Sequence, residues 1–244
     1  MLTLYHYWSS TCSRKVRICL FEKDIEWESH HIDIMDKIEQ TEPWYVKMNP
    51  TGVVPTIDHD GQIVIESNLI IEYLDDRFPG PSLSPEDPFE RSQMRLWMHK
   101  AEEYIHKNIN LISYVRRIMP ARTEIPKQVQ IEKIMRNPDP ARRAMKLRRL
   151  ENGVSDEEFA FARERITSVI DEAEWVLADN TWLAGNTYSL ADIAMAPFIE
   201  RMEANGLDEL TDASARPAVA EWWGRLRARP AYKKAFAFKN PEAA

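Results

Sequence analysis

The spacing of apolar residues changes along the chain, from short alternating segments near its start to helical repeats further on. Residues 2–6 alternate modestly, which predicts a short strand, and residues 26–32 can return as a second strand. Between them, residues 13–23 place apolar side chains at the i, i+3 and i+4 positions of a helix. We therefore expect a strand–helix–strand unit whose polar turn, residues 7–13, precedes the helix.

A β-hairpin is predicted in the next segment. Residues 56–57 and 62–65 are rich in β-branched side chains, and the turn between them ends in Asp-Gly, a hairpin signal. Pro55 stands at the start of the first strand, where a proline is tolerated because its nitrogen need not donate to the ladder. The cis form of an X-Pro bond lies only about 0.5–1 kcal/mol above the trans form. A cis bond would turn the backbone of Val54 toward a groove, where a bound peptide could pair with it as an added strand.

A helix is predicted directly after the hairpin. Residues 69, 70, 73 and 74 are apolar at helical spacing, so Ser67 is expected to be the N-cap of this helix. The free backbone donors of a helix N-terminus favour a carboxylate. Ser67 is therefore also a candidate anion-binding residue.

Beyond residue 80 only helical patterns are found. Residues 81–88 are rich in Pro and Ser, which is typical of a rigid linker, so we expect an α/β domain at 1–80 and an all-helical domain at 89–244. An apolar stripe predicts a long helix that ends near Arg117. Further helices are expected at 191–198, 217–227 and 230–238.

One pair of polar residues in the helical half has a structural interpretation. Ser189 and Asp192 have the spacing of a capping box at the start of the helix predicted at 191–198. We therefore interpret Asp192 as a folding residue and not as a catalyst.

The segment between Ile118 and Asp156 has no regular pattern of its own. It contains four prolines and a basic run at residues 142–149. Two interpretations remain open, a solvated basic helix after a surface loop and a patch that recognises negative charge.

Composition narrows the class of protein. The chain has 244 residues, 44% of them hydrophobic, and a formal net charge of -7 with both signs interspersed, which favours solubility and argues against nucleic acid or anionic membrane as a partner. No apolar run approaches the roughly 20 residues of a membrane span, and the first residues lack signal-peptide features, so a cytoplasmic location is expected. Cys12 and Cys19 predict neither a disulfide framework nor a metal site.

Two motifs carry a resemblance to a known family. Asn49 to Ile57 reads N-P-x-x-x-V-P-x-I, and Glu66 to Leu74 reads E-S-x-x-I-x-x-Y-L. Both, at this spacing, resemble the thioredoxin-like domain of the glutathione transferases. The resemblance implies that Val54, with Pro55 in the cis form, pairs with the cysteinyl backbone of glutathione and that Glu66 and Ser67 hold its γ-glutamyl end. It also implies that Gln40 binds the glycyl carboxylate, for which Lys47 is an alternative.

The polar turn has the position of the C-x-x-C pair of thioredoxins but holds Ser10 and Ser13 instead. Redox cycling through such a pair is therefore not available, whereas a hydroxyl can donate to the thiolate of glutathione. Lowering a thiol pKa by about two units requires roughly 2.7 kcal/mol. A hydrogen bond to a charged group supplies about 1.5–3 kcal/mol and a helix N-terminus about 0.3–1 kcal/mol more. One hydroxyl at this turn is therefore sufficient.

The resemblance leaves the identity of that hydroxyl open. The theta and zeta classes place their serine at Ser10, which is our first choice, and the bacterial β-aryl etherases place theirs at Ser13. Cys12 aligns with the active-site cysteine of the beta class and points to mixed-disulfide chemistry. The structural alternatives are that Ser13 is a helix N-cap and that Cys12 is an inert small residue.

The long 118–155 insertion, together with Asp87 to Arg91 and Glu103-Tyr104, resembles the bacterial β-aryl etherases and their fungal-type relatives. Such enzymes use glutathione thiolate to displace an aryloxide from a lignin-derived aryl ether, and the insertion can cover a large aromatic site. The resemblance implies a homodimeric enzyme with a hydrophobic co-substrate. Helix position suggests that its pocket includes Tyr104, Asn108 and Ile112. A zeta-type maleylacetoacetate isomerase and a non-catalytic ligand binder are the alternative functions.

Overall fold

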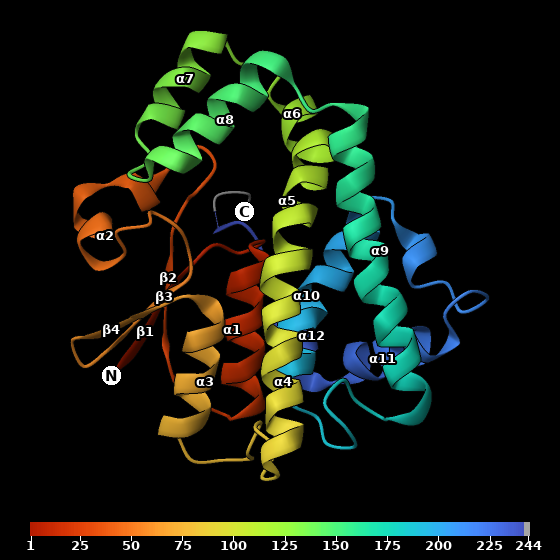
Figure 1. Ribbon diagram of the computed structural model, residues 1–244. Helices are drawn as coiled ribbons and strands as arrows, with labels where there is room; N and C mark the ends of the chain where they lie inside the picture. The colour runs from red at the N-terminus through yellow and green to blue at the C-terminus, as the bar shows by residue number, and fades with distance from the viewer. Residues whose placement is uncertain (242–244) are drawn as a thin grey trace.

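The computed structural model describes residues 1–241 and contains a four-stranded mixed sheet followed by a larger helical body (Figure 1). In the sheet the strand order is β2-β1-β3-β4, with β1 parallel to β2 and antiparallel to β3, and β3 antiparallel to β4. The expected fold class, a thioredoxin-like α/β domain followed by an all-α domain, is confirmed. The sheet consists of β1 (Leu2–His6), β2 (Glu28–His31), β3 (Thr56–His59) and β4 (Gln62–Ile65).

The helices of the first domain lie close to where the sequence predicts them, with two shifted starts. Helix α1 (Thr11–Glu22) begins two residues earlier than expected, because Ser10 and not Ser13 is its N-cap. Helix α3 (Ser67–Arg77) has Glu66 as its N-cap, so Ser67 is its first helical residue. The remaining helical elements of this domain are η1 (Glu39–Thr41) and α2 (Pro43–Met48).

The predicted long helix of the second domain is a continuous helical rod. It runs through α4 (Pro88–Lys100), the π-helical η2 (Ala101–His106), α5 (Lys107–Ser113), the π-helical η3 (Tyr114–Ile118) and α6 (Met119–Ala121). Helix α1 contacts α3, α10 and α12, so it lies between the two halves of the molecule (Figure 1). The other helical elements are α7 (Lys127–Met135), α8 (Pro140–Asn152), α9 (Asp156–Asp179), α10 (Leu190–Ala204), η4 (Asp208–Leu210), α11 (Pro217–Ala228) and α12 (Pro230–Phe236).

The predicted capping box begins α10. The hydroxyl of Ser189 accepts from the backbone N–H of Ala191, and the carboxylate of Asp192 accepts from the N–H of Ser189 at 3.0 Å. Asp192 is fully buried and also accepts from the N–H of Leu183 and from the indole N–H of Trp222. The predicted capping box of Ser189 and Asp192 is confirmed.

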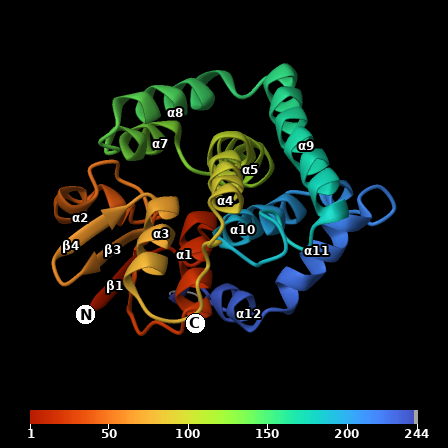
Figure 2. The same ribbon diagram turned by 60° about the horizontal axis from the view of Figure 1, so that its bottom comes forward.

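The insertion forms an arch, which we define as residues 122–155 with helices α7 and α8. In both views the arch extends from the end of the α4–α6 rod toward α2 and returns to α9 (Figures 1 and 2). It is joined to the first domain by an ion pair between Arg136 and Glu42, 2.5 Å apart. Pro138 also lies against Gly52. The arch therefore contacts the same loop that carries Val54.

Replacing Gly52 by Ala is expected to weaken this contact. Gly52 has a φ of +60°, and a Cβ at this position would lie 2.7 Å from Cδ of Pro138. The left-handed conformation costs about 1–2 kcal/mol for an L-residue, and overpacking adds about 1–3 kcal/mol. We expect G52A to lower the free energy of unfolding by about 2–5 kcal/mol in denaturant titration.

Gly61 provides the matched control, because its φ is +85° and nothing lies within 4 Å of the position of its Cβ. G61A should therefore show only the cost of the left-handed backbone conformation, without the cost of overpacking. Equal losses in G52A and G61A would contradict a close contact between the arch and Gly52.

Candidate active site

The register of the sheet brings three predicted segments to one edge. In the ladders, Thr56 pairs with both Tyr5 and Ile65. Val54 precedes β3, Tyr7 follows β1 and Ser67 follows β4, so all three lie just beyond the same end of these strands. Since Tyr7 leads into the serine turn, this edge carries the hairpin loop, the start of α3 and the start of α1.

Val54 offers an unpaired backbone at this edge. The Val54–Pro55 peptide bond is cis. Within residues 1–241, the backbone N–H and C=O of Val54 make no hydrogen bond. The preceding carbonyl, that of Val53, accepts from the hydroxyl of Tyr45 at 2.7 Å and from the side-chain amide of Asn49 at 2.9 Å. The loop is thus held in place while one of its peptide groups stays free to bind a ligand.

The two serines of the turn differ in exposure and in partner. Ser10 is partly exposed, and its Oγ accepts from the N–H of Ser13 at 3.2 Å. Ser13 is fully buried, and its Oγ accepts from the N–H of Tyr7 at 3.3 Å. The hydroxyl hydrogen of Ser10 is therefore the more accessible donor for an anion outside the turn.

Two arginines hold the turn through its backbone. Arg17 is fully buried and donates to the carbonyl of Trp8 at 2.7 Å. Arg201, on α10, donates to the carbonyl of Ser9 at 2.7 Å. Burial lowers the pKa of Arg17 to about 9 and that of Arg201 to about 10, which leaves both guanidinium groups charged at neutral pH. They fix the residues before Ser10 and add positive charge there.

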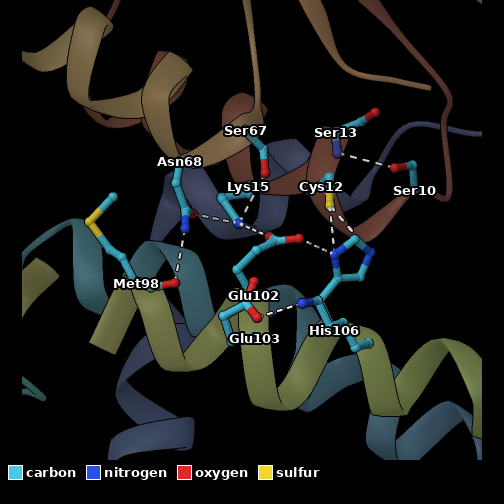
Figure 3. A network of polar contacts seen from close by, with 11 residues as sticks. Ser10, Cys12, Ser13, Lys15, Ser67, Asn68, Met98, Glu102, Glu103 and His106 are labelled. Atoms are coloured by element: carbon cyan, nitrogen blue, oxygen red, sulfur yellow. Dashed lines mark hydrogen bonds and ion pairs between the residues drawn. The ribbon is translucent and has the colours of Figure 1, made fainter. Parts of the chain in front are cut away.

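Cys12 faces the second domain, not the two serines (Figure 3). Its Sγ lies 3.7 Å from Nε2 of His106, and Nδ1 of His106 lies 2.6 Å from a carboxylate oxygen of Glu102. The other oxygen of Glu102 is 3.8 Å from Nζ of Lys15. Glu102 and His106 both belong to the π-helical segment η2, a kind of distortion often found at functional sites.

The charges of this group stabilise one another. Burial opposes ionisation of Cys12, but the charge and hydrogen bond of His106 outweigh it and lower the thiol pKa, with Lys15 contributing. Burial likewise opposes the imidazolium of His106, yet Cys12 and Glu102 raise its pKa well above the ordinary value. The pKa of Glu102 is lowered, because its hydrogen bond to His106 and the charges of His106 and Lys15 outweigh burial. The arrangement therefore stabilises the imidazolium of His106 and the carboxylate of Glu102, and it favours ionisation of the Cys12 thiol.

Replacing His106 by Gln is expected to suppress the reactivity of Cys12 at low pH. Without the imidazolium only Lys15 opposes the effect of burial, so the thiol pKa of Cys12 should rise. Because one pKa unit changes the thiolate fraction tenfold, alkylation of Cys12 by iodoacetamide at pH 6 should fall by about tenfold or more. Mass spectrometry of the labelled peptide measures the rate between pH 5 and 9.

Cys19 serves as an internal control in the same digest, because burial raises its thiol pKa and its side chain is fully enclosed. It should stay unlabelled in both proteins. An unchanged alkylation profile of Cys12 in H106Q would show that the imidazole does not set the thiol pKa.

The residues predicted for the two ends of glutathione have different surroundings. Glu66 is exposed and has a φ of 68°, an uncommon conformation for a residue other than Gly. The hydroxyl of Ser67 accepts from Nζ of Lys15 at 3.0 Å, and Lys15 also donates to Asn68 at 2.7 Å (Figure 3). Gln40 is buried, and its side-chain oxygen has no hydrogen-bond partner within residues 1–241.

The three residues predicted for the co-substrate pocket lie on the rod and have other contacts there. Ile112 is fully buried in the core, and the ring of Tyr104 lies under the guanidinium of Arg165 on α9. The side-chain amide of Asn108 donates to the carbonyl of Tyr104. These contacts do not bring the three side chains to the serine turn. The side that contacts α1 instead carries Glu102 and His106.

Sequence reasoning missed Lys15, Glu102 and His106. The i, i+4 spacing of Glu102 and His106 was a usable signal for a side-chain pair on one helix face. Their contact with Cys12 depends on how the domains pack, which no local pattern reveals. The ligand atoms of Cys12, Glu102 and His106 lie within 4.8 Å of one another, although Lys15 already supplies a positive charge beside Glu102.

A thioredoxin-like domain followed by an all-helical domain, with a serine at the N-terminus of α1 and an unpaired backbone before a cis-proline, defines a glutathione transferase. Family models agree: residues 4–82 match the N-terminal domain of glutathione S-transferase and residues 131–230 its C-terminal domain. The chain is also 32% identical over 239 residues to protein LigF of Sphingobium sp. (strain NBRC 103272 / SYK-6), covering 96% of this chain and 93% of LigF. The chain belongs to the glutathione S-transferase family.

The crystal structure of LigF and two further relatives bear on the same assignment. The crystal structure of the β-etherase LigF from strain SYK-6 superposes with a TM-score of 0.86 at 33% identity, over 96% of this chain and 98% of that one. Glutathione S-transferase TCHQD of Arabidopsis thaliana is 30% identical over 96% of this chain and 88% of its own length. A probable maleylacetoacetate isomerase of Caenorhabditis elegans is 40% identical, but only over 38% of this chain and 42% of its own length. Within residues 1–241, no helix is long and apolar enough to cross a membrane.

Proposed function

We propose that this glutathione transferase binds glutathione along Val54, Glu66 and Ser67. The sulfur of glutathione faces the hydroxyl of Ser10 in this proposal, and the hydroxyl of Ser13 is the second candidate. The unpaired backbone of Val54 is the observation that carries this assignment, because a bound peptide can satisfy both of its polar groups as an added strand would. Gln40 completes the site at the glycyl end.

The reaction that we propose is cleavage of a β-aryl ether, which the name of the related β-etherase LigF suggests. The glutathione thiolate attacks the β-carbon, a C–S bond forms, and the C–O bond breaks. The electron pair of that bond leaves with the aryloxide, which takes up the proton that the thiol lost. No oxidant or reductant is consumed.

The electrophile in this proposal is a hydrophobic aromatic ether, and the arch is the element that we expect to cover it. Support comes from the contact between Pro138 and Gly52, which brings the arch to within two residues of Val54. The conditions at the turn also suit this chemistry, since the charges of Arg17 and Arg201 favour both the attacking thiolate and the departing aryloxide.

Turnover of a fluorogenic β-aryl ether, measured together with glutathione affinity by calorimetry, tests this proposal. We expect glutathione-dependent release of the fluorescent phenol, and loss of glutathione affinity in Ser67→Ala. Binding of glutathione without turnover of this ether or of any other electrophile would favour a ligand-binding protein. Absence of glutathione binding would overturn the site.

The zeta-type isomerase is the second candidate, because the segment Ser10 to Ser13 and the partial identity to a probable maleylacetoacetate isomerase favour it. The arch counts against it. An isomerisation assay with maleylacetoacetate and glutathione separates the two functions.

A homodimer is part of the proposal and is supported by exposed apolar side chains on α3 and α4. Leu69 is 57% exposed, Phe89 71% and Leu96 41%. We expect light scattering to give twice the 28.5 kDa mass of one chain. Leu69→Glu combined with Leu96→Glu should yield monomer, whereas the control Phe161→Glu on α9 should not. A monomer mass for the unaltered protein at every concentration would contradict the dimer.

A further inference from the structure

A cavity of about 480 Å³ lies where the arch joins the rod, apart from the serine turn. Its walls come from the end of the rod, the start of α7 and the end of α8. Tyr114 on this wall is eight residues beyond His106, or about 12 Å along a helix. The volume is in the range of small-molecule sites.

Three cations line this cavity, and the more distant carboxylate of Glu158 acts on one of them, Arg149, in the direction that raises its pKa. Within residues 1–241, the charged ends of Arg122, Lys127 and Arg149 make no ion pair and no hydrogen bond. The Nε of Arg149 is buried and unsatisfied. Glu124 is a fourth charged group in the lining and is exposed. The positive charge of the lining is therefore only partly balanced.

The start of α7 adds backbone donors to the same lining. Pro126 is the N-cap of α7 and no side chain caps the helix, so the N–H groups of its first turn lack intrahelical partners. Pro126 and Lys127 both line the cavity. A negative group beside them would be favoured by the helix N-terminus as well as by the cations.

The remaining wall is apolar. Ile125 and Leu150 lie on it, and the ring of Tyr114 has the guanidinium of Arg149 over it, 5.8 Å from the centroid. Burial, followed by the charge of Arg148, lowers the pKa of Arg149. A ligand that contacts both the cationic and the apolar part of the lining would need a negative end and an apolar body.

We propose that this cavity binds an organic carboxylate whose body is an aromatic ring, at a site separate from the glutathione site. The carboxylate lies against Arg122 and Arg149 near the start of α7, and the ring lies against Ile125, Leu150 and Tyr114. Arg149 belongs to the basic run at residues 142–149, for which the sequence allowed a charge-recognition patch as one interpretation. In this proposal Arg149 recognises the carboxylate.

The test uses 1-naphthoate as the probe and the neutral 1-naphthalenemethanol as its uncharged analogue, both titrated into the full chain by calorimetry. We expect the naphthoate to bind at least about tenfold more tightly, and Arg122→Gln or Arg149→Gln to remove that difference, since each deletes a hydrogen bond to a charged group. Affinity for the alcohol should stay unchanged in both variants.

Arg148→Gln is the matched control, because Arg148 lies beside Arg149 on α8 but pairs with Glu158 at 2.7 Å. It removes the same charge and should leave naphthoate binding intact. Ser67→Ala should also leave it intact, while Arg149→Gln should not alter glutathione affinity. Equal binding of the two probes, or an equal loss in R148Q and R149Q, would overturn the proposal. A loss in S67A would place the naphthoate in the glutathione site instead.

Discussion

Replacing Ser10 by Gly is expected to reduce glutathione-dependent turnover at pH 7 by about 20-fold or more. Without the hydroxyl, the pKa of the bound thiol should return by about two units to its ordinary value near 8.5, so that only a few per cent remains thiolate at pH 7. Because a higher pH restores the thiolate, the loss should shrink as the pH rises above 8.5. Ultraviolet difference titration of the bound thiolate measures the shift directly.

Gly is the better replacement because Ser10 is also the N-cap of α1. Gly retains most of the capping stability, whereas Ala costs about 0.5–2 kcal/mol. Ser9→Ala is the matched control, since Arg201 binds the backbone carbonyl of Ser9, which the substitution keeps. Ser13→Ala should cost about 1–3 kcal/mol of stability by leaving the N–H of Tyr7 unpaired, with little effect on the thiol pKa. The reverse pattern in S10G and S13A would assign the reaction to Ser13.

Replacing Asp192 by Ala should cause the largest loss of stability, about 2.5–8 kcal/mol. The substitution removes one half of a capping box and leaves the N–H groups of Leu183 and Trp222 without their acceptor. A lost cap contributes about 0.5–2 kcal/mol and each unpaired buried donor about 1–3 kcal/mol. Denaturant titration measures the loss. Asp87→Ala is the control, because Asp87 caps α4 in an exposed position.

The loss of unfolding free energy in D192A should also depend on pH. Burial is the main cause that raises the pKa of Asp192, to about 6, above the value of about 3.8 in an unfolded chain. The folded protein therefore takes up a proton as the pH falls below 6, and this uptake stabilises the folded state until the unfolded chain is protonated too. Between pH 7 and pH 5 the deficit of D192A should grow by about 1 kcal/mol. A constant deficit would mean that the carboxyl does not titrate in this range.

Local patterns predicted the elements of the fold well. The hairpin before Glu66 and the capping box at Ser189 follow from short-range chemistry, and both are found. The start of α3 was misplaced by one residue, because the positive φ of Glu66 lets it serve as N-cap without a side-chain bond. The partners of Cys12 were not predictable, since they lie about ninety residues away and meet it only through domain packing.

The arch joins the first domain to the second at a point far along the chain from the segment between α3 and α4. The pair Arg136–Glu42 and the contact of Pro138 with Gly52 make a closed ring of chain that includes both domains. These two contacts restrict rotation of one domain relative to the other. Because α1 also packs against α10 and α12, the two domains should unfold in a single cooperative transition, and cleavage of the chain within α7 or α8 should lower its midpoint without splitting it.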